Sequence, residues 1–115
     1  MKELTQTEKA ALNICGEFQQ LTKIAGINLT NDIRECSKDL SALYQMRRVM
    51  KGLRAILPKH EVVDQRTGKV IGDLYDNEYV ERVMMATNIS INSNIQHTEG
   101  HIRFICRSKY ILNTH

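Results

Sequence analysis

The chain contains a single proline, Pro58, which separates two differently patterned parts of the sequence. The residue before a proline avoids the α-helical region, so a helix that reaches this point must end there. Residues 1–57 carry apolar side chains at three- and four-residue spacing, which is typical of amphipathic helices. Residues 59–115 contain shorter runs in which apolar and polar residues alternate. The sequence therefore predicts helices before Pro58 and a mixed structure after it.

Two helices are expected before Pro58, at about residues 6–25 and 30–57. The first opens with Thr5-Gln6-Thr7-Glu8, a capping box in which the Thr and Glu side chains each bind the other residue's backbone. Gly26 follows as a natural C-terminal stop, because glycine tolerates the left-handed cap conformation. The second helix opens at Thr30-Asn31-Asp32, whose side chains suit an N-cap. The short link between the two helices predicts an antiparallel helical hairpin.

A β-hairpin is expected directly after Pro58. Two β-branched runs, Glu61–Asp64 and Lys69–Ile71, flank a turn at Gln65–Gly68 that contains glycine. Asp73 or Asp76 is then placed to cap a short helix. The apolar residues of that short helix are Tyr79, Val80, Val83 and Met84.

The last third of the chain fits two structures. Isoleucines alternate with polar residues over 87–96, and a second alternating run covers 102–107 after a turn at Thr98–Gly100. This period of two predicts a C-terminal β-hairpin, and asparagine and β-branched residues are poor helix formers. The alternative is one long helix, because a second apolar set recurs at three- and four-residue spacing. Its members are Val80, Met84, Ile91, Ile95, Ile102, Ile105 and Leu112.

We therefore predict one α+β domain over residues 1–115. Its expected order is a helical hairpin, a β-hairpin, a short helix and a C-terminal β-hairpin. The alternative fold is an all-α bundle with a long C-terminal helix. The length of 115 residues suits a single domain.

The sequence also predicts the compartment. No run of apolar residues is long enough for a membrane helix, and the polar N-terminal segment does not have the pattern of a secretory signal. The three cysteines are odd in number and widely spaced, which disfavours a disulfide framework. We expect a cytoplasmic protein with reduced thiols and no membrane partner.

No catalytic, nucleotide-binding or metal-binding motif is recognisable, so we predict a protein that is not an enzyme and has no cofactor. His97 and His101 stand four residues apart and would share one face of a helix, with Cys106 as a third zinc ligand. The zinc-protease pattern needs Glu directly after the first histidine, where this chain has Thr98. We predict no metal site.

Positive charge concentrates in the second predicted helix. Residues 30–60 contain seven Lys or Arg and three acidic residues, a net charge of +4. Arg47, Lys51 and Arg54 recur at helical spacing and Arg48 lies beside them, while Arg103 and Arg107 share one side of the predicted last strand. Such cations can neutralise phosphates of nucleic acid, although cations near a helix C-terminus also complement the helix dipole. The leading hypothesis is a regulatory protein that binds duplex DNA through these residues.

The alternative hypothesis is a protein–protein interaction module, such as an inhibitor or an assembly adaptor. The apolar surface of the second helix exceeds what one neighbouring helix covers, and methionines suit adaptable interfaces. A homodimer through this helix is one form of the hypothesis. The interface residues expected are Met46, Val49, Met50, Leu53, Ile56 and Leu57.

Overall fold

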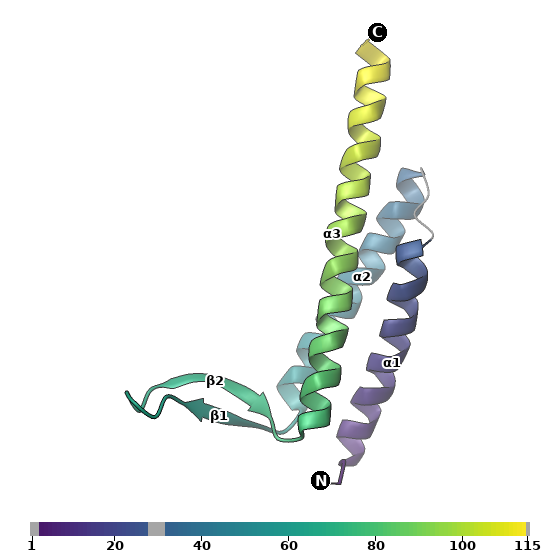
Figure 1. The fold of residues 1–115 in the computed structure, drawn as a ribbon. Helices are drawn as coiled ribbons and strands as arrows, with labels where there is room; N and C mark the ends of the chain where they lie inside the picture. Colours follow the sequence, from purple (N-terminus) through teal and green to yellow (C-terminus); the bar gives the residue numbers. More distant parts are fainter. Residues whose placement is uncertain (1–2, 28–31, 115) are drawn as a thin grey trace.

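The computed structural model describes residues 3–27 and 32–114, with side chains for 3–23 and 32–108. The chain forms helices α1 (Gln6–Ile27) and α2 (Ile33–Ile56), strands β1 (Lys59–Val63) and β2 (Val70–Tyr75), and helix α3 (Glu78–Thr114). The predicted α+β class is confirmed, as is the order of two helices followed by a β-hairpin. Figure 1 shows α1 and α3 running in one direction, α2 in the opposite direction, and the hairpin projecting sideways from one end of the bundle.

The predicted helix boundaries of α1 and α2 are largely confirmed. In the capping box, Thr5 N donates to Glu8 Oε1 at 2.9 Å and Glu8 N donates to Thr5 Oγ1 at 3.1 Å. The Asp32 carboxylate caps α2 by accepting from Arg34 N at 2.9 Å, whereas Thr30 and Asn31 lie outside the described residues. Helix α2 ends at Ile56, two residues before Pro58. Helix α1 continues through Gly26 to Ile27, so the predicted stop came two residues early.

The predicted short helix and C-terminal β-hairpin are wrong. Residues 78–114 form one helix of 37 residues, as in the alternative prediction, although the chain as a whole is not all-α. Neither Asp73 nor Asp76 caps it: Asn77 Oδ1 accepts from Tyr79 N at 2.9 Å and from Val80 N at 3.3 Å. The buried residues of α3 follow three- and four-residue spacing rather than alternation. They are Val80, Met84, Thr87, Ile91, Ile95, Thr98 and Ile105.

Tertiary packing explains why α3 is a helix despite its poor local helix propensity. Helix α3 packs extensively against both α1 and α2, which contact each other far less. Together the two helices cover a stripe on α3 that only helical spacing can fill. Burial of this stripe from Val80 to Ile105 outweighs the propensity differences of a few tenths of a kcal/mol per residue, so the helix is formed.

Polar side chains of α3 at or near the contact with α1 have hydrogen-bond partners on α1 or within α3. Thr87 Oγ1 donates to Val83 O at 2.7 Å and accepts from Gln19 Nε2 at 2.9 Å. The hydroxyls of Thr22 and Ser90 lie 2.7 Å apart across the same contact. Asn94 Nδ2 donates to Ser90 O at 2.8 Å. These hydrogen bonds remove the cost of burying polar groups inside a helical interface.

Two of the three cysteines are part of the buried core. Cys15 Sγ lies 3.5 Å from Met84 Sδ, joining α1 to α3, and Cys36 is buried in α2. Burial raises the pKa of the Cys15 thiol, and the opposing effect of its hydrogen bond with Thr87 is smaller. Cys106 is exposed. All three are free thiols, as predicted.

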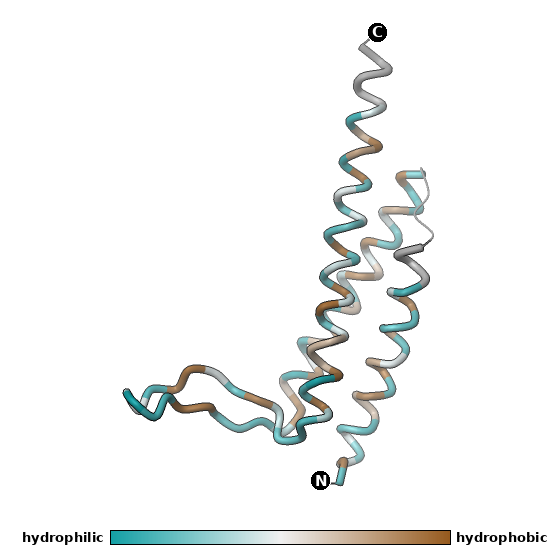
Figure 2. Tube along the Cα trace, viewed as in Figure 1, coloured by the Kyte–Doolittle hydropathy of each residue, from teal (hydrophilic) through white to brown (hydrophobic). Residues whose placement is uncertain are grey.

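The β-hairpin, residues 59–75, is called the arm. Its strands pair antiparallel, with Lys59 opposite Tyr75 and Val63 opposite Val70. The predicted turn is confirmed: Gly68 has a φ of 69° and its N donates to Asp64 O at 2.8 Å. A positive φ suits glycine because a side chain would clash there. Figure 2 shows hydrophobic segments on the arm as well as along the helices.

None of the helices within residues 3–27 and 32–114 combines the length and apolar character needed to cross a bilayer.

Candidate nucleic-acid interface

An exposed group of cations lies on the second half of α2. Arg47, Arg48 and Lys51 are all exposed, and we call them the basic face of α2. No Asp or Glu occurs between Leu40 and Pro58. Within the part of the chain that the structure describes, no carboxylate forms an ion pair with these three residues. The basic face therefore presents its full positive charge to a partner.

The position of Arg48 follows from helix geometry. At 3.6 residues per turn, Arg48 lies opposite the buried side of α2, which carries Leu43, Met50 and Leu53. Arg47 and Lys51 are one turn apart on a neighbouring line of the helix. Arg48 thus points away from the bundle core, whereas Arg47 and Lys51 lie along its flank, where both are exposed.

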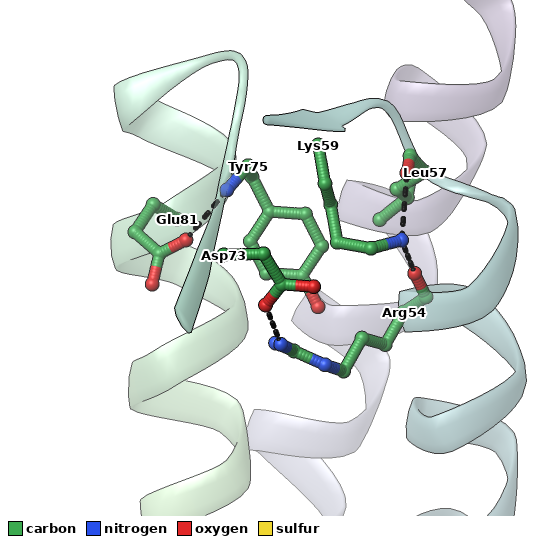
Figure 3. Close-up of polar contacts among 6 residues, drawn as sticks. All are labelled: Arg54, Leu57, Lys59, Asp73, Tyr75 and Glu81. Atoms are coloured by element: carbon green, nitrogen blue, oxygen red, sulfur yellow. Dashed lines mark hydrogen bonds and ion pairs between the residues drawn. The ribbon is translucent and has the colours of Figure 1, made fainter. Parts of the chain in front are cut away.

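Arg54, the fourth cation of the predicted stripe, is used inside the molecule. Its guanidinium pairs with the Asp73 carboxylate and lies 5.7 Å from the centre of the Tyr75 ring (Figure 3). The Tyr75 hydroxyl is the main cause of a raised pKa of Arg54. Burial raises the pKa of Tyr75, while Arg54 opposes this effect. Arg54 therefore joins α2 to the base of the arm and is less available than its neighbours.

Lys59 reinforces the same junction. Its Nζ donates to Leu57 O at 3.1 Å and to Arg54 O, next to the end of α2 (Figure 3). These carbonyls belong to the last turn of the helix, where unpaired acceptors carry partial negative charge. Lys59 thus caps α2 as it leads into β1.

A polar depression of about 390 Å³ adjoins the basic face. It is lined by Ser41, Tyr44, Gln45 and Arg48. Hydroxyl, amide and guanidinium groups are those that proteins commonly use to contact phosphate oxygens. Sequence reasoning missed Ser41, Tyr44 and Gln45. The sequence could have indicated them, because they recur at three- and four-residue spacing on the side of α2 opposite its apolar stripe.

Tyr44 also connects α2 to α3. Its hydroxyl donates to Glu99 Oε1, and this hydrogen bond is the largest cause of the raised pKa of Tyr44. Tyr44 and Glu99 therefore lie at the same level of the two antiparallel helices. Tyr44 is also the one aromatic residue in the sequence of α2.

Arg103 and Arg107 are exposed, but on a helix rather than on the predicted strand. The hydrogen bond between Tyr44 and Glu99 sets a common level for α2 and α3. From that level the two arginines lie further along α3, whereas Arg47 lies further along α2, which runs in the opposite direction (Figure 1). At 1.5 Å rise per residue, Arg103 and Arg47 are displaced by about 10 Å along the bundle axis. The structure therefore places the two α3 arginines as a separate group beyond the basic face.

The predicted apolar interface of α2 is divided by the fold. Met50, Leu53 and Leu57 are buried in the bundle core, and Met46 is partly buried against it. Val49 and Ile56 are exposed. Of the six predicted interface residues, all of which the structure describes, only these last two present an open apolar side chain.

His97 and His101 lie on α3 one turn apart, as their spacing requires of a helix. The His101 ring stacks on Phe104 with 6.4 Å between ring centres. Among residues 3–27 and 32–114, no three ligand-type side chains gather as a metal site would need.

The chain matches no known family model, no curated protein and no solved structure.

Proposed function

We propose that this protein is a non-catalytic regulatory protein that binds double-stranded nucleic acid through the basic face of α2. The observation that carries the proposal is the exposure of Arg47, Arg48 and Lys51 on an acid-free stretch of helix. Each cation that neutralises a phosphate releases condensed counterions, which favours binding. Ser41 and Gln45, beside Arg48, supply neutral groups for further phosphate contacts.

A duplex fits this surface better than a single strand. Proteins that bind single strands stack the bases on aromatic side chains. The only aromatic residue of α2 is Tyr44, whose hydroxyl is held by Glu99. The regular backbone of a duplex needs only a convex charged helix, which α2 provides.

A salt-resolved titration tests the proposal. Fluorescence anisotropy would follow a labelled duplex mixed with the full chain at several salt concentrations. The logarithm of the binding constant falls by about 0.9 per neutralised phosphate for each unit of log salt, so three contacts give about 2.7. The triple variant Arg47→Ala, Arg48→Ala, Lys51→Ala should bind more weakly and reduce the slope by about this amount.

The matched control removes three exposed lysines elsewhere, by Lys9→Ala, Lys23→Ala and Lys38→Ala. This variant has the same net charge as the first triple variant and should keep most of the slope. The proposal fails when the unmodified chain does not bind a duplex at low salt. It also fails when the two triple variants are equally weakened.

Protein binding through the predicted apolar residues of α2 has less support, because Met50, Leu53 and Leu57 are buried.

For the location of the protein in the cell, we propose a reducing compartment such as the cytoplasm. Its basis is the three free thiols of the chain, two of them within the core.

A further inference from the structure

The arm presents apolar side chains that its own chain leaves uncovered. Val63, Val70 and Ile71 are 47%, 55% and 68% exposed. The sheet has two strands, so each strand has one edge without a neighbouring strand in the described part of the chain. An isolated two-stranded hairpin is marginally stable in water. The outer part of the arm therefore gains stability from a surface that covers it.

A groove lies between the base of the arm and the start of α3, and we call it the crook. It has a volume of about 430 Å³ and is lined by both elements, including Leu74 from the arm and Glu78 and Arg82 from α3. Met85 and Ile89 lie three and seven residues after Arg82, so they continue the same face of α3. Both are exposed. The crook thus has an apolar wall on the arm, at Leu74 and Tyr75, and Met85 and Ile89 add exposed apolar surface to α3 beyond it.

The crook and the tip of the arm carry opposite charges. The crook contains Asp76, Glu78 and Glu81, of which Glu81 accepts from Tyr75 N at 3.0 Å and Asp76 lies 2.9 Å from His60 Nδ1. The tip, residues 64–69, carries Arg66 and Lys69 against Asp64, a net charge of +1. The crook carries its three carboxylates against Arg82, a net charge of −2 with histidine counted as neutral. The tip is therefore basic with apolar flanks, and the crook is acidic with an apolar wall on the arm.

One copy of the chain does not join these two surfaces, because the turn of the arm lies at the end of the hairpin farthest from α3 (Figure 1). We propose that two copies associate with the arm of each seated in the crook of the other. In a twofold pair the arms run antiparallel, so each basic tip meets the partner's acidic crook. The same arrangement covers the apolar residues of both arms. This association uses none of the residues of the basic face and does not depend on nucleic-acid binding.

A charge-swap cycle tests the pairing on the full chain without nucleic acid. Sedimentation velocity over a range of protein concentrations should show a monomer–dimer equilibrium. Lys69→Glu and Glu78→Lys should each weaken dimerisation by roughly tenfold or more, because each places like charges together in both halves of the twofold contact. The double variant on one chain restores opposite charges and should recover most of the affinity.

The controls are Lys9→Glu and Glu17→Lys, which make the same charge changes at exposed positions of α1 and should leave the dimer intact. Ile71→Asp should abolish the dimer while circular dichroism shows unchanged helix content. A chain that stays monomeric throughout overturns the proposal. A dimer that ignores the arm variants, or a double variant as weak as the single ones, also overturns it. The Arg47→Ala, Arg48→Ala, Lys51→Ala variant should dimerise normally, which separates this proposal from the proposed function.

Discussion

The bundle and the arm reach their structures by different routes. Ile91 in α3 is 1% exposed and lies between two other helices, whereas Ile71 in β2 is 68% exposed. The bundle is held by a continuous apolar core. The arm is joined to it mainly by contacts at its base, among them the Arg54–Asp73 ion pair and the 3.0 Å hydrogen bond from Tyr75 N to Glu81 Oε2.

The difference shows which interactions select each conformation. In the arm, local chemistry is sufficient to form the turn: the Asp64 carboxylate accepts from Arg66 N at 3.0 Å and from Thr67 Oγ1 at 3.2 Å. Gly68 then reverses the chain. In α3, local preference favours a strand and long-range burial selects the helix. The arm should therefore tolerate changes in burial, and the bundle should tolerate changes in local propensity.

The largest contrast is expected for truncation of these two isoleucines. Ile91→Ala should lower the free energy of unfolding by about 2–5 kcal/mol, because it leaves a cavity in the core. Ile71→Ala should change it by less than about 0.5 kcal/mol at low protein concentration, since the side chain is exposed. Urea unfolding followed by circular dichroism measures both values. Equal losses would show that the arm is part of the cooperative core.

An intermediate effect is expected at the start of α1. Thr5→Ala removes the hydroxyl that accepts from Glu8 N and should lower the free energy of unfolding by about 1 kcal/mol. Thr7→Ala is the matched control, because Thr7 is an exposed residue inside the helix and alanine has the higher helix propensity. Thermal unfolding of both variants compares them. A Thr7 variant as unstable as the Thr5 variant would contradict a specific capping role.

The smallest effect on the bundle is expected at Gly68. Gly68→Ala forces a side chain into a left-handed conformation and should cost about 1–2 kcal/mol within the arm. Amide hydrogen exchange should therefore quicken over residues 59–75, while the amides of α3 keep their protection. Gly16→Ala serves as a comparison, because an added Cβ meets nothing within 4 Å and should stabilise α1 by about 1 kcal/mol. Faster exchange throughout α3 in the Gly68 variant would mean that arm and bundle unfold together.

Predictions from sequence succeeded where neighbouring residues carry the whole interaction. The Thr5–Glu8 capping box, the Asp32 cap and the stop before Pro58 each involve residues within a few positions of one another. The cations of the candidate interface were also visible in the sequence, as Lys and Arg residues that recur at helical spacing. The sequence did not show that Arg48 faces solvent while Arg54 pairs with Asp73, because this difference depends on where the arm returns to α2.

Local sequence chemistry was sufficient to predict the start of α1, the two ends of α2, the turn of the arm and the charge of α2. That residues 78–114 form one helix depended on tertiary packing, since the same isoleucines satisfy both an alternating and a helical pattern. The physical reason is that hydrogen bonds of caps and turns are local, whereas burial requires a surface supplied by distant residues. For Ile91 and Ile95 that surface is provided by the other helices of the bundle.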